Sequence, residues 1–395
     1  MKRLYEVNLS HDSITPYQAK ISDLRHLIRE EEIDEIVSKK FPLEKCGEME
    51  ELLKIKGTRS LLEGFNQIDC IKFDIIASLD SIRLAGFSES QMVLEFSPDR
   101  NIPGDRELLA EGIYSFTYDF LEYNFSMGKF SNYCLENQHL DLLEYNTNKL
   151  LREVSNKTNQ YRILKADNDN YFIRAHTSTR YKNYDNHLAI YLALYSVNIY
   201  AKRQRTTFRM NKAYITDSDL YIFIEQENPF LIKQVGYVYF GIMIKNNELA
   251  DGALTIDFRF RVHSDEGMKF SVLQEQVLSI SHAVTVSNIS NKLENLNRFA
   301  DLRNNALNLI NVIKKSPYLS EDNLYDIFKK IIYSKTAFSK ETKERVKEIK
   351  ETLNNTYTII NLFDRLGEIT TDIEERLHLE RIYDNALKNH AKGNK

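Results

Sequence analysis

The spacing of apolar residues changes along the chain from helical to strand-like and back to helical. Apolar residues recur every three or four positions in 14–41 and, with an interruption at 124–132, in 108–154, which predicts helices there. From 161 to 275 they fall on every second position of several short runs, which predicts strands. Beyond residue 277 the helical spacing returns, with breaks at Ser316-Pro317 and around 336–340. The pattern predicts an α+β protein with an N-terminal helical region, a central mostly antiparallel sheet and a C-terminal helical subdomain.

The expected domain boundaries follow the changes in this pattern. The stretch 97–107 contains two prolines and no apolar run, which is typical of an exposed loop. The second boundary lies where the last strand gives way to helices. We therefore expect an N-terminal helical or mixed region at 1–105, a central α+β sheet domain at 106–280 and a C-terminal helical subdomain at 281–395.

The most regular strand pattern lies at 252–263. Its apolar residues share one face, and Arg259 and Arg261 lie on the other. A shift of one residue would bury both arginines without partners, so the apolar face must be the one that meets the core. We predict a single antiparallel sheet whose core face contains four residues of this strand: Leu254, Ile256, Phe258 and Phe260.

Composition and charge exclude several classes of protein. The 395 residues carry 53 basic and 57 acidic side chains, a net charge of −4, so the chain as a whole is not a polycation. Cys46, Cys70 and Cys134 lie far apart, which argues against a disulfide framework and against a cysteine-rich zinc site. The longest apolar stretch, 187–201, is shorter than the roughly 20 residues that span a bilayer. We expect a cytoplasmic protein without a membrane partner.

A run of basic residues follows the predicted helix at 186–201. Between residues 187 and 216 the chain has no acidic residue, while tyrosines and Phe208 are interleaved with the cations. Cations neutralise phosphates and aromatic rings stack on bases, which is the minimal requirement for binding a single strand. The candidate nucleic-acid-binding residues are the basic residues of this run and two arginines on the polar face of the predicted strand 252–263: Lys202, Arg203, Arg205, Arg209, Lys212, Arg259 and Arg261. Alternatively, the acidic residues at 217–227 pair with this run and leave an ordinary solvated surface.

The densest group of polar residues lies on a predicted β-hairpin and just after it. Two strand-like runs, 161–167 and 171–178, flank the turn residues 168–170. On the second run His176 and Ser178 would share a face, but no third group is present to orient a histidine base, so the pair predicts no catalytic site. We therefore interpret these polar residues as the solvent-facing side of a sheet, or as a helix cap supplied by Asp185 or Asn186.

Three segments resemble landmarks of a known family. They read RAHTSTRYKNYDNHLAIYLAL, GYVYFGIMIKNNELADGALTIDFRFRV and NTYTIINLFDRLGEITTDIEERLHLERIYDNAL, and they occur in the family's order between about residues 160 and 390. They are similar to those of phage- and plasmid-borne proteins whose function is unknown. The first landmark falls on six residues of this chain: Arg174, Ser178, Arg180, Tyr181, Asp185 and Asn186.

The later landmarks depart from the family pattern at two places. Asn246-Asn247-Glu248 stands where relatives have Asn-Ser-Glu, and Ser264 to Gly267 stands where relatives often have Cys-Asn-Gly. The resemblance implies an accessory protein of a mobile element, because relatives are found among replication and recombination functions. Annealing of single strands is the class of activity that this association implies.

Three functions remain open. The leading hypothesis is a non-catalytic nucleic-acid-associated protein of a phage or plasmid that binds or anneals single strands. The first alternative is a protein-interaction factor that acts on a host system, in defence or counter-defence, without nucleic acid. The second is a metal-dependent nuclease, for which acidic residues are abundant: Asp217, Asp219, Glu225, Glu227, Glu248, Asp251 and Asp257.

The sequence identifies no catalytic residue, no metal ligand and no cofactor site. No phosphate-binding glycine loop and no dinucleotide fingerprint occurs in it. A binding protein is favoured over an enzyme for this reason. The expected partners are single-stranded nucleic acid and a second copy of the chain, which would associate through the C-terminal helices.

Overall fold

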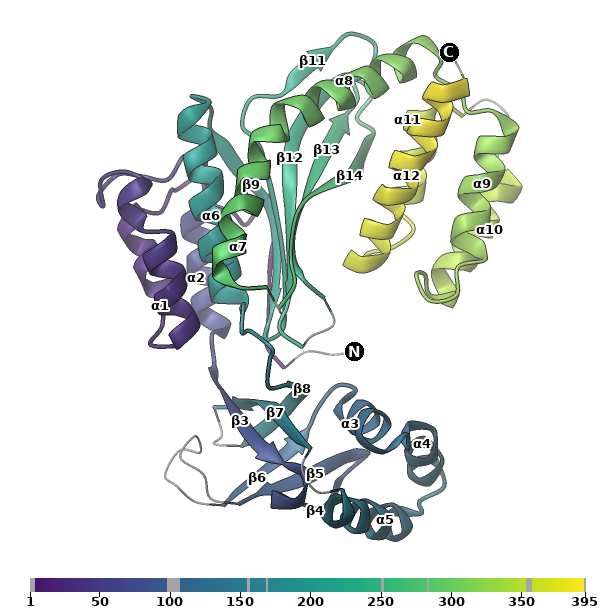
Figure 1. The fold of residues 1–395 in the computed structure, drawn as a ribbon. Coiled ribbons are helices and arrows are strands. Elements are labelled where there is room, and N and C mark those ends of the chain that lie inside the picture. The colour runs from purple at the N-terminus through teal and green to yellow at the C-terminus, as the bar shows by residue number, and fades with distance from the viewer. Residues whose placement is uncertain are drawn as a thin grey trace.

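The chain folds into two units, each with its own sheet and hydrophobic core (Figure 1). The computed structural model describes residues 4–97, 107–154, 157–167, 170–249, 252–282, 284–352 and 357–393. A main body contains the described residues up to 70 and from 179 onward, and an inserted domain contains those between 71 and 178. The predicted α+β class is confirmed.

The main sheet is built from strands that are far apart in sequence. Its path is β1-β9-β10-β12-β13-β14, with every pair on the path antiparallel, and two short strands join at its sides. The strands are β1 (Glu6–Leu9), β2 (Ile55–Lys56), β9 (Phe208–Thr216), β10 (Asp219–Gln226), β11 (Phe230–Ile232), β12 (Gly236–Asn247), β13 (Leu254–His263) and β14 (Lys269–Ile280). β2 runs parallel to β9, so the sheet is mostly rather than wholly antiparallel.

The inner face of the main sheet carries the larger core. The four core residues predicted on β13 are each at most 1% exposed, and Phe258 packs with Phe240 and Phe299 at ring-centroid distances of 6.3 and 5.1 Å. The helix α6 (Asn186–Arg203) crosses this face and is buried along most of its length, which explains why its sequence lacks a polar side. The helices α1 (Glu32–Lys40), α2 (Thr58–Ile68), α7 (Val286–Leu293) and α8 (Phe299–Lys315) complete the inner layer.

The C-terminal helices lie beside the last strand and reach the outer face of the main sheet. α11 and α12 pack against β14. Leu377 on α12 contacts a small apolar cluster of the outer face that includes Phe223, Met243 and Leu273. The bounds of these helices are α9 (Glu321–Ile332), α10 (Lys340–Thr352), α11 (Ile359–Gly367) and α12 (Ile373–Gly393). The gaps before α9 and before α10 agree with the two breaks that the sequence pattern predicts, whereas the gaps before α11 and α12 are not predicted. No helix among the described residues is both long and apolar enough to cross a membrane.

The inserted domain has a six-stranded sheet with helices packed on it. The strand order is β3-β7-β8-β6-β5-β4; β6 runs parallel to β8, and the other neighbouring strands of this path are antiparallel. The strands are β3 (Ile71–Ser78), β4 (Ile82–Ser88), β5 (Gln91–Phe96), β6 (Leu108–Gly112), β7 (Thr158–Lys165) and β8 (Tyr171–Ser178). The helices α3 (Phe116–Phe125), α4 (Gly128–Glu136) and α5 (Leu140–Glu153) pack on this sheet and enclose the second core.

Several sequence predictions differ from the structure. The single sheet predicted over 161–275 is wrong, because β7 and β8 form their hairpin in the inserted domain and not in the main sheet. The helix predicted at 108–154 begins instead with β6, and the helix predicted at 14–41 contains a short 3-10 helix, Ile21–Leu27, followed by α1. In each case pairing or packing with distant residues outweighs the local pattern.

The domain limits also differ from those expected at 105 and 280, because the inserted domain recruits strands from both sides of residue 105. Local composition does not reveal this, since a strand's partners are chosen by long-range pairing. The centre of the predicted hairpin turn, residues 168–169, and most of the predicted loop at 97–107 lie outside the described residues.

Candidate nucleic-acid interface

The seven cations predicted to bind nucleic acid fall into two groups. Lys202, Arg203 and Arg205 lie at or just after the end of α6. Lys202 binds the Glu51 carboxylate at 2.5 Å, and Arg203 donates a 2.8 Å hydrogen bond to the Asn297 side chain. The other four, Arg209, Lys212, Arg259 and Arg261, lie on β9 and β13.

One buried carboxylate serves two of the arginines on the outer face. Glu225 on β10 accepts hydrogen bonds from Arg209 at 2.7 and 3.0 Å and from Arg261 at 2.9 and 3.2 Å. The ring of Tyr239 lies next to both guanidinium groups, 5.0 Å from Arg209 and 4.3 Å from Arg261. Because one negative charge meets two positive charges, this part of the face keeps an excess of positive charge.

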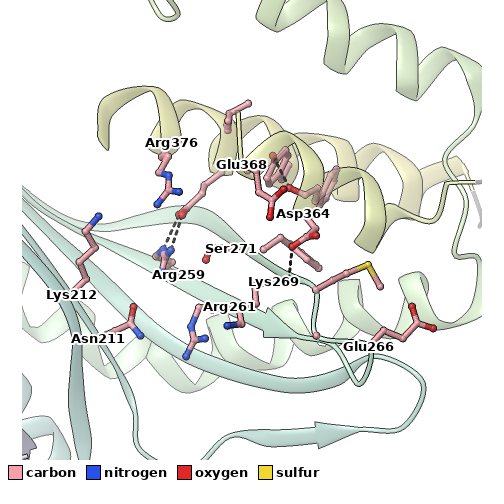
Figure 2. Close-up of a pocket in the computed structure, with 18 residues that line it drawn as sticks. Asn211, Lys212, Arg259, Arg261, Glu266, Lys269, Ser271, Asp364, Glu368 and Arg376 are labelled. Carbon is pink, nitrogen blue, oxygen red and sulfur yellow. Dashed lines mark hydrogen bonds and ion pairs between the residues drawn. The ribbon is translucent and has the colours of Figure 1, made fainter. Parts of the chain in front are cut away.

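A groove separates the outer face of the main sheet from α11 and α12. Its volume is about 670 Å³, and Figure 2 shows cations entering it from the sheet and from the helix above. The basic residues that line it are Lys212, Arg259, Arg261, Lys269 and Arg376, and the acidic ones are Glu266, Asp364, Glu368 and Glu380. Lys269 and Arg376 are absent from the sequence prediction, because nothing in the local pattern places α12 over β9 and β13.

Only part of the positive charge in this groove is neutralised. Arg259 holds both oxygens of Glu380 at 2.7 Å and lies over the ring of Phe223. Arg376 donates through Nε to the carbonyl of Thr370. Within the described part of the chain, the ammonium groups of Lys212 and Lys269 have no recorded hydrogen-bond or ion-pair partner.

Lys212 is the most unusual of these cations. Its side chain is partly buried, and Figure 2 shows it rising from β9 into the groove near Arg376. Burial, followed by the positive charges of Arg376 and Arg259, lowers the pKa of Lys212, whereas Glu380 opposes the shift. The charges that act on Lys212 are therefore mainly positive, which favours an anion beside it in this part of the groove.

A second group of charged residues joins the inserted domain to the main body. The junction cluster consists of Lys72, Asp74, Arg162, Arg174, Asp185 and Glu248. Glu248 binds Lys72 at 2.8 Å and Arg174 at 2.6 Å, while Arg162 binds Asp185 at 2.5 Å. Three of its side chains are cationic and three are anionic, so the charges within the cluster balance.

The cluster keeps its acidic groups ionised. Burial alone would raise the pKa of Asp185, but the charge and hydrogen bond of Arg162 reverse this effect and hold the pKa well below its usual value. Burial and the charge of Asp185 likewise raise the pKa of Glu248, whereas Lys72, Arg174 and Arg162 lower it, and the net shift is downward. The pairs are therefore ionic at neutral pH.

The segments 174–194 and 236–262 meet in this cluster. The backbone N–H of Asn186 donates to Glu248 at 3.0 Å, and the side chain of Asn246 donates to that of Asn186 at 2.9 Å. Tyr181 stacks on His282 with ring centroids 4.6 Å apart. Ser178 and Arg180, the remaining residues of the first landmark, are exposed. The sequence pattern did not point to Arg162, the residue that links Asp185 to the inserted domain.

Two smaller expectations can be compared with the structure. Asp185 occupies the N-cap position of α6, but its side chain makes no capping hydrogen bond, because Arg162 binds it instead. His176 packs against the rings of Phe116, Phe120 and Tyr123, and burial lowers its pKa to about 4. The ring is therefore neutral at physiological pH and packs, partly buried, against aromatic residues of the inserted domain.

The acidic residues considered for a nuclease are mostly engaged by cations. Glu225 and Glu248 are paired as described, and Asp257 binds Arg381 at 3.2 Å. The described residues contain no group of three or more His, Cys, Asp or Glu side chains arranged to hold a metal ion. Asp251 lies outside the described residues.

Comparison with protein-family models, with curated proteins and with solved structures gives no significant match to this chain.

Proposed function

We propose that this protein binds single-stranded nucleic acid in the groove between the outer face of the main sheet and the C-terminal helices. The observation that supports this most strongly is the convergence of five basic side chains on one groove. Three of them, Lys212, Lys269 and Arg376, have no acidic partner among the described residues, although four acidic side chains also line the groove. Phosphates of a single strand would pair with these three cations. This groove differs from the binding site that the sequence predicts. Lys202 and Arg203, two of the predicted residues, engage other segments of the chain.

Two aromatic side chains on the outer face of the main sheet support binding of a strand over binding of a simple anion, and one of them, Tyr239, lies against Arg261 of the groove. Tyr237 and Tyr239 lie two residues apart on β12 and therefore share a face of the sheet. The side chain of Tyr237 is 46% exposed. A base stacked on such a ring gains about 1–3 kcal/mol irrespective of its identity, so binding with little sequence preference is expected.

The biological context of this binding is also part of the proposal. The segments that resemble phage- and plasmid-borne proteins support a role as a non-catalytic accessory in recombination or replication, such as annealing of complementary strands. The meeting of the first two of these segments around Glu248 is consistent with a shared structural requirement. Self-association through the C-terminal helices is part of this proposal, because it would bring two bound strands together for annealing.

The test is a titration of a fluorescently labelled single strand at several salt concentrations. Three phosphate contacts, to Lys212, Lys269 and Arg376, correspond to a slope of about −2 for log affinity against log salt. The variant Lys212→Ala/Lys269→Ala should bind more weakly and flatten the slope by about 1.4. It breaks no recorded ion pair of the described structure, so its fold should persist.

The matched control removes the same charge elsewhere. Arg203→Ala/Arg205→Ala also deletes two cations, but at the end of α6, and should bind like the unmodified protein. If the two double variants bind equally well, the groove is not the binding site. If the unmodified protein binds no single strand even at low salt, the proposal fails and the protein-interaction hypothesis takes its place.

A further inference from the structure

The groove holds a lysine whose surroundings differ from those of an ordinary surface lysine. Lys212 extends from β9, where its strand neighbour on β10 is Phe223. The charged groups that act on it are Arg259 on β13 and Arg376 and Glu380 on α12. Because Glu380 gives both oxygens to Arg259, it is not available as a full counter-ion for the Lys212 ammonium group.

We propose that Lys212 is a reactive amine, and that the groove takes aldehydes bearing a phosphate group, with which Lys212 forms an imine. Burial of the side chain, followed by the charges of Arg376 and Arg259, favours the neutral amine, which is the nucleophilic form. The same cations recognise the phosphate of the incoming compound. A guanidinium such as Arg376 therefore has two effects: it destabilises the protonated lysine and it holds the anionic part of the ligand close by.

The covalent step is a simple condensation. Lys212 first releases one proton to solvent, and its nitrogen lone pair then attacks the aldehyde carbon, so that a C–N bond forms and the carbonyl π bond opens. The two remaining protons on nitrogen are transferred to the oxygen, which leaves as water while the C=N bond forms. No oxidant or reductant is consumed, and the reverse reaction with water regenerates the lysine.

The groove is large enough for such a compound. A volume of about 670 Å³ lies within the range of 300–1,000 Å³ that is common for small-molecule sites. This inference uses the cations of the proposed nucleic-acid groove, but it concerns a chemical step that binding of a strand does not require. The two are tested by different measurements, so one can fail while the other holds.

The first experiment treats the full-length protein with limiting pyridoxal 5′-phosphate, reduces the imine with borohydride and maps the modified lysines by mass spectrometry. Lys212 should be labelled ahead of Lys39, whose side chain is 76% exposed and pairs only with Glu35. Each unit by which the pKa is lowered increases the neutral fraction about tenfold at neutral pH. Labelling of Lys212 should also reach its half-maximum at a lower pH than labelling of Lys39.

Two comparisons separate the reactive amine from an adventitious modification. Pyridoxal, which lacks the phosphate, should label Lys212 at least several-fold less than pyridoxal 5′-phosphate, and labelling of Lys39 should change little. Arg376→Gln should reduce labelling of Lys212, whereas Arg203→Gln at the end of α6 should not. Equal labelling of Lys212 and Lys39, or no effect of Arg376→Gln, overturns the proposal.

A second arm distinguishes the sources of a phosphate-bearing aldehyde. Ribose 5-phosphate and a single strand with one abasic site are each incubated with the protein and cyanoborohydride. Trapping of either on Lys212, and its loss in Lys212→Arg, supports the proposal and identifies a free sugar phosphate or a nucleic-acid lesion as the source. If neither compound is trapped, the proposal fails, while strand binding measured on the same samples reports separately on the proposed function.

Discussion

Arg162 of the inserted domain donates a 2.5 Å hydrogen bond to Asp185 at the start of α6, and both side chains are almost completely buried, at 1% and 5% exposure. The same guanidinium contacts Asp74 on β3 and the backbone carbonyl of Glu248. One arginine therefore links a strand of the inserted domain to a helix and a loop of the main body. Such a buried pair is costly to break, because the remaining charge loses its partner without regaining water.

Replacing Arg162 should destabilise the protein strongly. In Arg162→Met the carboxylate of Asp185 stays buried without its main counter-charge, which costs about 3–5 kcal/mol. The control is Arg83→Met in the same domain, where the arginine pairs with Glu95 and is 66% exposed. That variant should lose far less stability, because an exposed ion pair is screened by water. Urea unfolding measures both, and similar losses would contradict the role assigned to Arg162.

Stability should fall in acid because of Asp185 and Glu248. The structure holds both pKa values below their ordinary 3.8 and 4.5, so the unfolded chain binds more protons in this range. The free energy of unfolding therefore rises with pH there, and the stabilisation is lost as pH falls below about 4.5. Asp185→Asn should show a shallower loss than the unmodified protein, whereas Glu89→Gln on the surface should not. Urea unfolding at a series of pH values measures these slopes, and parallel curves for all three proteins would refute the assignment.

Truncating Phe258 should open a cavity in the core of the main body. Its ring is fully buried between Phe240 and Phe299, and Phe258→Ala should cost about 3–5 kcal/mol. Phe230→Ala is the comparison, since that ring is 36% exposed on the short strand β11. It should cost markedly less. A loss below about 1 kcal/mol for Phe258→Ala would show that the facing of β13 is wrong.

Removing residues 341–395 should produce a protein that associates with itself. The deletion takes away α12, and with it Leu377, which covers Phe223, Met243 and Leu273 on the outer face. Contiguous apolar surface of this kind is rarely left exposed by soluble monomers. Light scattering after size-exclusion chromatography measures the mass of the product. A folded, monomeric product would show that the main sheet does not need this cover.

The parts of the fold that the sequence predicts well are those with a clear local period. The alternation in 252–263 identifies β13 and its core face, and the breaks near Pro317 and Lys340 limit the helices α8 and α10. The inserted domain was missed because its strands pair across long distances: β3 with β7, and β6 with β8. The sequence of one strand does not identify the distant strand with which it pairs.

In the candidate site, too, the residues set by local periodicity are predicted, whereas those set by long-range packing are not. Arg259 and Arg261 were placed correctly on the polar face of their strand, because a period of two fixes the facing of every residue. Lys269 and Arg376 were missed, since one lies at the start of β14 and the other on a helix that reaches the groove only after the fold is complete. The packing of two distant segments is a feature of tertiary structure, and the sequence of either segment alone does not predict it.

The pairing of β1 with β9 constrains the order in which the chain can fold on the ribosome. β1 ends at Leu9 and its partner begins at Phe208, so the first strand waits while about 200 residues are made, roughly 10–40 s at ordinary rates of synthesis. The inserted domain is complete in sequence by Ser178, before β9 exists. Folding during translation therefore begins in the middle of the chain, and the N-terminal residues are recruited afterwards as a late addition to the main sheet.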